Sequence, residues 1–231
     1  MGKMKTEIIL ALDFDRLEDA QRMVRETQDW VSRYKIGSIM FTAFGPRSVE
    51  LVRAEGKEVF LDLKFHDIPN TVRGAVRGAC RWGVSMLTVH CAGGIEMMRA
   101  AISGADEGVQ AHGSIRPKII GVTVLTSLSV SGDALGRVLE LTDDAAQAGI
   151  DGVVCSPAEV SHVKQSHGQR LLAVVPGIRL PQDSTDDQVR VGTPRQAARD
   201  GADFLVVGRS VTGADNPGET LHQILKEVGN A

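Results

Sequence analysis

The chain has 231 residues and a formal net charge of −3, with 42% hydrophobic and 24% charged residues. This composition is that of a globular protein and excludes a largely disordered or membrane-embedded chain. The acidic balance argues against nucleic-acid binding, which needs a basic surface to neutralise phosphates. The length suits one large α/β domain, so we expect a single domain over residues 1–231.

The cysteines and the apolar runs indicate a cellular location. Cys80, Cys91 and Cys155 are odd in number and widely separated, which predicts neither a disulfide framework nor a zinc cluster. The apolar run from Ile8 to Leu12 is too short for a signal-peptide core or a membrane span. We therefore predict a cytoplasmic protein that binds neither nucleic acid nor membrane.

Short β-branched and apolar runs recur along the chain, and a longer segment with helical spacing follows each of them. This alternation is typical of βαβ units and a parallel sheet. Eight repeats without a linker favour a closed barrel over a doubly wound open sheet, so we predict a (β/α)₈ TIM barrel. Its expected strands are Glu7–Phe14, Tyr34–Ile39, Glu58–Leu63, Met86–Cys91, Lys118–Leu125, Gly152–Ser156, Leu171–Pro176 and Phe204–Gly208.

The first three predicted strands end in charged residues. Asp62 and Lys64 are two residues apart and would share one face of a strand. An isolated pair of this kind is best interpreted as a structural ion pair. Asp13 and Lys35 change that interpretation, because they would face the same cavity and create an array of alternating charge. Carboxylates around a lysine would keep it as an ammonium group, as a proton donor to a carbanion requires.

The next three predicted strands end in polar residues with simpler explanations. His90 ends the fourth strand and has the chemistry of a general base. Hydrogen bonding at the barrel mouth is the better explanation of this histidine, so we assign it no catalytic role. Thr126 follows the fifth strand, and Ser156 is expected to be the N-cap of the next helix.

The last two predicted strands are followed by arginines. Gly208 would let backbone N–H groups approach an anion, and Arg209 would supply a forked cation where barrels of this class often bind phosphate. Arg179 follows the seventh strand and opens a long connection, residues 177–192, which is either a mobile lid or a surface excursion. Asn216 is expected to be the N-cap of the last helix.

Six segments of the chain resemble those of bacterial orotidine 5'-phosphate decarboxylases, in the same order and over essentially the whole length. The ten residues from Asp62 to Thr71 are the most specific part of the resemblance. The segments are Ala11-Leu12-Asp13, Tyr34-Lys35-Ile36-Gly37, Asp62-Leu63-Lys64-Phe65-His66-Asp67-Ile68-Pro69-Asn70-Thr71, Thr123-Val124-Leu125-Thr126-Ser127, Pro176-Gly177-Ile178-Arg179 and Val207-Gly208-Arg209-Ser210.

The resemblance implies decarboxylation of orotidine 5'-phosphate to uridine 5'-phosphate (UMP), the last step of de novo UMP synthesis, without a cofactor or a metal. By the family's pattern, Lys64 would protonate the C6 carbanion, and Asp62 would lie beside the substrate carboxylate. Asp67 would cross the interface of a homodimer and complete the array of the partner subunit.

The other matching positions imply contacts with the substrate. These are Asp13 and Lys35 at the ribose, Thr126 facing the pyrimidine, Ile68 and Thr71 near the partner's ligand, and Arg179, Gln188, Gly208 and Arg209 at the phosphate. Gln188 would also link the phosphate to the base.

Two other functions stay open at this point. The magnesium-dependent keto-gulonate-phosphate decarboxylases and hexulose-phosphate synthases share an Asp-X-Lys-X-X-Asp element, but they generally carry an acidic metal ligand on the second strand. Lys35 stands there instead, and its charge would repel Mg²⁺. A catalytically silent barrel could also bind a nucleotide phosphate, for which Gly208 and Arg209 would suffice without Lys64.

Overall fold

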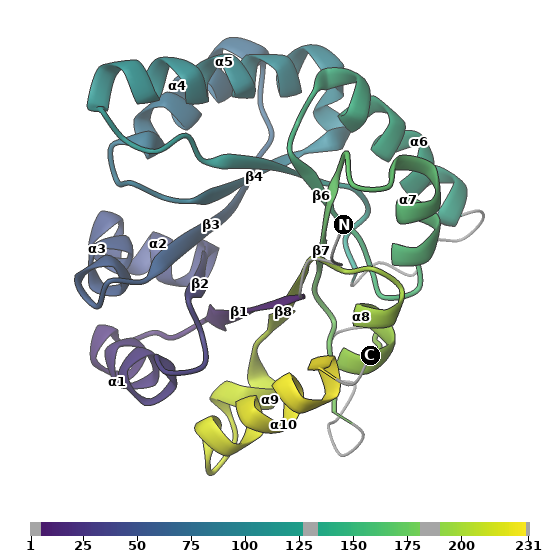
Figure 1. The fold of residues 1–231 in the computed structure, drawn as a ribbon. Coiled ribbons are helices and arrows are strands. Elements are labelled where there is room, and N and C mark those ends of the chain that lie inside the picture. Colours follow the sequence, from purple (N-terminus) through teal and green to yellow (C-terminus); the bar gives the residue numbers. More distant parts are fainter. Residues whose placement is uncertain (1–5, 127–133, 181–189, 230–231) are drawn as a thin grey trace.

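The computed structural model of the chain describes residues 6–126, 134–180 and 190–229. Eight parallel strands pair in chain order, and β1 pairs with β8, so the sheet closes into a barrel. Figure 1 shows the helices outside the ring of strands. The predicted (β/α)₈ barrel is confirmed. The strands are β1 (Glu7–Leu12), β2 (Arg33–Gly37), β3 (Glu58–Phe65), β4 (Met86–His90), β5 (Lys118–Val122), β6 (Gly152–Val154), β7 (Leu172–Val175) and β8 (Phe204–Val207).

Most predicted strands extend past the last paired residue. Phe14, Ile39 and Leu125 are apolar, but they follow the ends of β1, β2 and β5, and Ile39 already belongs to helix α2. The segments that follow these strands surround a cavity whose lining is partly apolar, so an apolar run continues after strand pairing has ended. β3 differs, because its pairing continues two residues past the predicted end, to Phe65.

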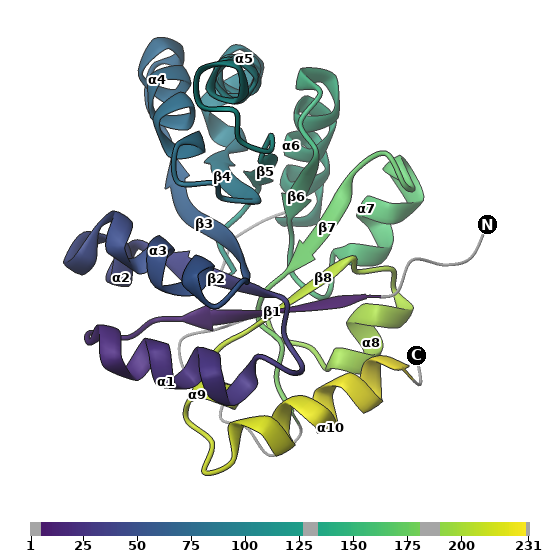
Figure 2. The ribbon, with the colours of Figure 1, turned by 60° about the vertical axis from the view of Figure 1, so that its left-hand side comes forward.

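The helices cover the outside of the barrel, and Figure 2 shows α1 beside α10. Their bounds are α1 (Leu17–Thr27), α2 (Ser38–Phe44), α3 (Pro46–Ala54), α4 (Pro69–Cys80), α5 (Gly94–His112), α6 (Ala134–Ala148), α7 (Val160–His167), α8 (Pro194–Arg199), α9 (Arg209–Thr212) and α10 (Pro217–Gly229), with a short 3₁₀ turn η1 (Cys91–Gly93). Among the described residues, no helix has the length and apolar character needed to cross a bilayer.

Two predicted helix starts have different outcomes. The Oδ1 atom of Asn216 accepts a hydrogen bond from the backbone N–H of Glu219 at 3.2 Å, which confirms Asn216 as the N-cap of α10. The prediction for Ser156 is wrong, because α7 begins at Val160 and its N-cap is Glu159. The backbone N–H of Ser156 donates instead to Glu159 Oε2 at 2.7 Å, so a turn separates β6 from its helix.

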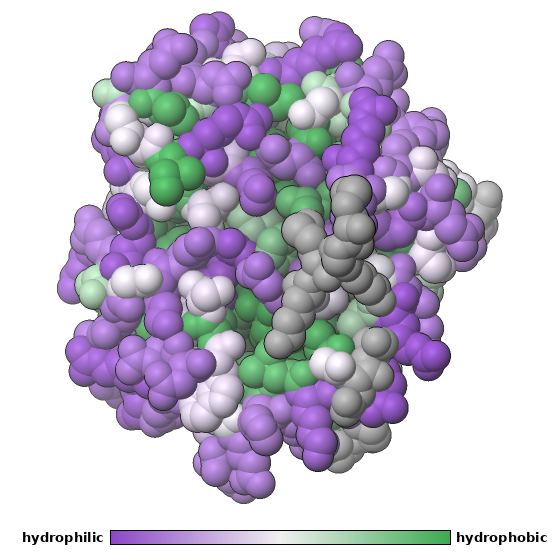
Figure 3. All heavy atoms as spheres, in the orientation of Figure 1, coloured by the Kyte–Doolittle hydropathy of each residue, from purple (hydrophilic) through white to green (hydrophobic). Residues whose placement is uncertain are grey.

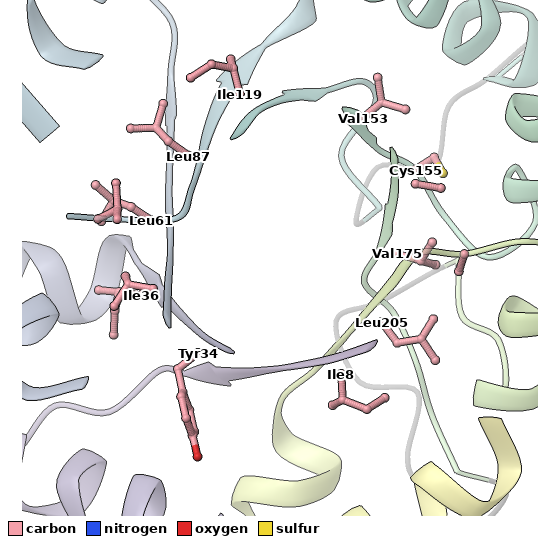
Figure 4. Close-up of a cluster of buried hydrophobic side chains, with 14 of the residues drawn as sticks. Ile8, Tyr34, Ile36, Leu61, Leu87, Ile119, Val153, Cys155, Val175 and Leu205 are labelled. Carbon is pink, nitrogen blue, oxygen red and sulfur yellow. The ribbon is translucent and has the colours of Figure 1, made fainter. Parts of the chain in front are cut away.

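The apolar core has two layers. The outer layer lies between the strands and the helices, and Figure 4 shows its side chains pointing away from the barrel axis. The inner layer fills the barrel and consists of Ile9, Ala11, Phe60, Met86, Ile120, Val174, Phe204 and Val206. Each fully buried large apolar side chain contributes about 1.5–3 kcal/mol to folding. The inner layer also forms a rigid floor for the cavity above it.

Candidate active site

A cavity of about 560 Å³ opens where the strands reach their C-terminal ends. Phe60, Val174 and Val206 of the inner core form its floor. Figure 3 shows one face of the molecule, on which hydrophilic side chains predominate and apolar side chains are visible between them. Most predicted site residues line this cavity: Asp13, Lys35, Asp62, Lys64, Thr126, Arg179, Gly208 and Arg209.

Two lysines and two aspartates form a continuous array along one wall of the cavity. The Nζ atom of Lys64 lies 2.8 Å from Asp62 Oδ2, and the Nζ atom of Lys35 lies 3.5 Å from the same oxygen. Lys35 Nζ also lies 3.5 Å from Asp13 Oδ1. The carboxylate of Asp62 therefore bridges two ammonium groups, which is the alternating arrangement predicted from the sequence.

The environment of Asp62 keeps its carboxyl group ionised. Burial by itself raises the pKa of this carboxyl. The charges of Lys35 and Lys64, together with hydrogen bonds from Lys64 and Thr88, outweigh burial and hold the pKa below its usual value. A fixed negative charge is thus present in the cavity wall at neutral pH.

The backbone of Lys64 departs from regular strand geometry. Its φ of 52° is the only positive value at a non-glycine residue in the part of the chain that the structure describes. The pairing of β3 with β4 also shifts register between Leu61 and Phe65. The left-handed conformation costs a residue with a Cβ about 1–2 kcal/mol. Such strain persists only where surrounding contacts enforce it, and it often marks functional positions.

Thr88 of β4, which no pattern in the sequence indicated, supplies these contacts. Its Oγ1 accepts a hydrogen bond from the backbone N–H of Lys64 at 2.8 Å and donates one to Asp62 Oδ1 at 3.0 Å. Thr88 is fully buried, so this hydroxyl fixes both members of the Asp62–Lys64 pair. A hydroxyl on the inward face of an otherwise apolar strand is the signal that could have identified it.

A second stretch of the cavity wall, after β7 and β8, carries the arginines predicted to bind phosphate. Arg179 follows β7, and Arg209 begins α9 directly after Gly208. Thr212, which the sequence analysis did not single out, lines the same wall. The Gly208 carbonyl accepts hydrogen bonds from the backbone N–H groups of Val211 and Thr212, at 2.8 and 3.0 Å, which fixes this turn. The cavity is therefore lined by arginines after β7 and β8 and by the Lys–Asp array at β1 to β3.

Four predicted site residues are not placed in this cavity. Asp67 and Ile68 lie on the exposed connection from β3 to α4, Thr71 lies exposed in the first turn of α4, and none of the three lines the cavity. Asp67 Oδ1 accepts the backbone N–H of Ile68 at 2.6 Å, and Ile68 is 67% exposed. Gln188 belongs to residues 181–189 of the long connection after β7, which lie outside the described residues.

The histidines near Lys64 form a separate pair. The ring centroids of His66 and His90 are 5.1 Å apart. Burial lowers the pKa of His90 below its usual value, and the neighbouring His66 and Lys64 lower it further. Together these effects favour the neutral form of His90, although the nearby Asp62 charge acts in the opposite direction on its pKa. Among the described residues, no cluster of three His, Cys, Asp or Glu side chains could hold a metal ion.

Fold and cavity together define a (β/α)₈ barrel of the enzyme type, with polar groups gathered at the C-terminal ends of its strands. Comparisons with known proteins identify the family. The model of the orotidine 5'-phosphate decarboxylase / HUMPS family matches residues 6–224, and this chain belongs to that family.

Several named relatives align over nearly the whole chain. The orotidine 5'-phosphate decarboxylase of Legionella pneumophila (strain Corby) is 44% identical over 97% of this chain and 100% of the relative. That of Saccharophagus degradans is 45% identical over 97% of this chain and 96% of the relative. The crystal structure of the Lactobacillus acidophilus orotidine 5'-phosphate decarboxylase superposes with a TM-score of 0.82 at 34% identity, covering 98% of this chain and 100% of that structure.

Proposed function

We propose that this chain is a carboxy-lyase that converts orotidine 5'-phosphate to UMP in pyrimidine biosynthesis. The observation that carries the proposal is the Lys–Asp array of Asp13, Lys35, Asp62 and Lys64 in the wall of a cavity that Arg179 and Arg209 also line. The family match and the named relatives support the same substrate. The three described cysteines are free, which fits a reducing cytoplasm as the site of the reaction.

The nucleotide would span the cavity from one wall to the other. Its phosphate would bind at Gly208 and the two arginines, because forked guanidinium groups match phosphate geometry. Its ribose hydroxyls would contact Asp13 and Lys35. The pyrimidine would lie between the Lys–Asp array and Thr126. Gln188 would close over the nucleotide and link its phosphate to its base.

The chemical step needs only charge and one proton. The bond between C6 and the carboxylate carbon breaks, CO₂ leaves without the bonding electrons, and the electron pair stays on C6. The Nζ of Lys64 donates a proton to C6, and the resulting amine regains a proton from water. Asp62 is held ionised beside the departing carboxylate and disfavours its charge. The ammonium groups that Asp62 holds in place stabilise the carbanion without rearranging during the reaction.

The exposed connection after β3 would serve a second subunit. Asp67, Ile68 and Thr71 lie outside the chain's own cavity and are solvent-exposed, as residues that complete a partner's site would be in an isolated chain. We propose a homodimer in which Asp67 of each subunit joins the Lys–Asp array of the other. The two active sites would then be shared between the subunits.

Mixed dimers test the shared sites. A Lys64→Ala chain lacks the proton donor, and an Asp67→Ala chain lacks the group that it lends to its partner. In a heterodimer one of the two sites retains both groups, so mixing the two inactive variants should restore part of the wild-type rate. Subunit exchange is monitored with differently tagged chains. No recovery despite demonstrated exchange would argue against shared sites.

An absorbance assay of orotidine 5'-phosphate turnover, with and without EDTA, tests the proposed reaction. Turnover that EDTA does not affect is expected. Metal-dependent turnover of another sugar phosphate, without activity on the nucleotide, would assign the chain to the HUMPS side of the family. Absence of turnover on both, with UMP still bound, would indicate a nucleotide-binding barrel without catalysis.

A further inference from the structure

Arg190 contacts two of the connections that surround the cavity without lining the cavity itself. It lies between β7 and α8, and its Nη2 donates to the carbonyl oxygens of Val124 and Leu125 at 3.0 and 2.9 Å. Its Nη1 forms an ion pair with Glu159, on the turn before α7. Arg190 is not among the described residues that line the cavity. Its side chain therefore acts on the site only through other residues.

The backbone that follows Arg190 is hydrogen-bonded to the backbone at Arg179, one of the arginines that we assign to the phosphate. Gly192 donates its N–H to the Gly177 carbonyl at 3.0 Å and accepts the N–H of Arg179 at 2.9 Å. A Cβ at Gly192 would lie 2.5 Å from the Cβ of Pro157, so this backbone also packs tightly on the connection after β6. A displacement of Arg179 would thus be passed to Arg190 through two backbone hydrogen bonds and a short stretch of chain.

The guanidinium of Arg190 reaches the wall that we assign to the pyrimidine. Val124 and Leu125 line the cavity next to Thr126. Their two carbonyl oxygens and the Glu159 carboxylate surround one guanidinium, which has enough N–H donors in one plane to serve all three. Glu159 is only 4% exposed, and its other oxygen accepts the N–H of Ser156 at 2.7 Å. The anchor for Arg190 is therefore itself fixed.

We infer that Arg190 is a positioning residue that transmits phosphate binding to the pyrimidine side of the cavity. Arg179 lies on the connection after β7, and Gly192 is hydrogen-bonded to that connection. Arg190, two residues before Gly192, links it to residues 124–126. Glu159 orients the guanidinium and balances its charge. The inference rests on the proposed function, in which one nucleotide contacts Arg179 through its phosphate and lies beside residues 124–126 with its pyrimidine.

The kinetic test compares two substrates, orotidine 5'-phosphate and the phosphate-free nucleoside orotidine. The ratio of their kcat/KM values measures how much the phosphate accelerates the reaction of the base. Arg190→Ala is expected to lower this ratio roughly 10- to 100-fold, because a misplacement of about 1 Å at a reacting group has effects of that size. The loss should fall on the nucleotide and leave the nucleoside rate within about threefold. Equal losses on both substrates, or none, would overturn the inference.

Arg116→Ala is the matched control. Arg116 is also a partly buried arginine that pairs with carboxylates, those of Asp106 and Asp151, but it precedes β5 at the opposite end of the barrel. The Arg116→Ala variant should have a lower melting temperature but an unchanged ratio of kcat/KM values for the two substrates. Arg190→Lys serves if the alanine variant does not fold, since it keeps a charge for Glu159 but loses the planar fork. A wild-type ratio in that lysine variant would count against the inference.

A measurement without turnover separates this inference from the proposed reaction. Inorganic phosphate is added to the full chain, and hydrogen exchange is followed in peptides that cover residues 122–126. Phosphate should slow exchange there in the wild type and in Arg116→Ala, but not in Arg190→Ala. If the wild type fails to decarboxylate the nucleotide yet shows this protection, the reaction is wrong and the coupling holds. If phosphate protects all three proteins equally, or none of them, the coupling is wrong.

Discussion

Charged residues lie at both ends of the barrel interior, and the two ends use them differently. At the N-terminal end, Arg33 pairs with Glu7 and Glu58 and stacks on the ring of Phe204 at 4.9 Å. Two carboxylates and an aromatic face surround this single cation, so its interactions are complete within the protein. At the C-terminal end, Asp62 bridges Lys35 and Lys64 beside an open cavity.

Between the two ends the barrel interior is apolar. The change from apolar to charged side chains takes place within two residues of a strand. In β3, Phe60 belongs to the inner core at 1% exposure, while Asp62 belongs to the Lys–Asp array. In β1, the inner core includes Ile9 and Ala11, and Asp13 follows. The lower residues stabilise the barrel, and the rim residues are those to which we assign the chemistry, with backbone strain at Lys64. Mutations at the two levels should therefore separate stability from turnover.

The largest effect is expected for Lys64→Ala at the rim. Loss of the proton donor and of a stabilising charge should lower kcat by ~10³-fold or more. The variant should fold and bind UMP, as circular dichroism and calorimetry can verify. Lys118→Ala, at the exposed start of β5, is the control and should be fully active. Near-normal turnover of Lys64→Ala would refute its assigned role.

The inner core should show the opposite behaviour. Ile9→Ala removes a fully buried side chain that does not line the cavity, so the free energy of unfolding should fall by about 3 kcal/mol. Measured well below its melting temperature, the variant should keep a kcat within a few-fold of wild type. Ile9→Val, which removes one methylene group, should lose about 1 kcal/mol. A large loss of kcat without a loss of stability would contradict the division between the two levels.

The arginines that line the cavity after β7 and β8 should affect nucleotide binding more than the chemical step. Arg209→Ala is expected to raise KM for the nucleotide and the dissociation constant of UMP by roughly 100-fold, because a forked charge-assisted contact with phosphate is lost. Steady-state kinetics and calorimetry measure the two quantities. Arg137→Ala removes an exposed arginine paired with Glu140 and should change neither. Unchanged UMP binding in Arg209→Ala would move the phosphate site elsewhere.

The smallest effect concerns the strain at Lys64. Both Lys64→Gly and Lys64→Ala remove the ammonium group, but only glycine adopts a φ of 52° without a steric penalty. The glycine variant should therefore be about 1 kcal/mol more stable than the alanine variant in urea unfolding. If alanine were the more stable of the two, the left-handed backbone would not be a source of strain.

Much of this arrangement follows from sequence, because strand periodicity and barrel closure are local and repetitive signals. The eight strands and the charges at their ends were predicted on that basis. The geometry at Lys64 was not, since a period of two residues assumes a regular strand and the register shift breaks it. Thr88 and Arg190 were missed for a related reason. Their roles come from contacts between β4 and β3 and between successive connections, which no local pattern records.

The assignment of Asp67, Ile68 and Thr71 rests on the resemblance alone. Within one chain, these exposed residues lie outside the cavity, and the sequence pattern around them predicts only the start of α4. Ser156 illustrates the reverse error, in which a plausible local motif gave way to a turn. The buried carboxylate of Glu159 satisfies that backbone instead.

A crystal structure of the protein with UMP tests the central claim most directly. The phosphate should lie at Gly208 and Arg209, and C6 of the base should lie within about 3–3.5 Å of Lys64 Nζ, close enough for proton transfer. A nucleotide bound with its base turned away from the Lys64 ammonium, or with its phosphate against the Asp62 wall, would contradict the account.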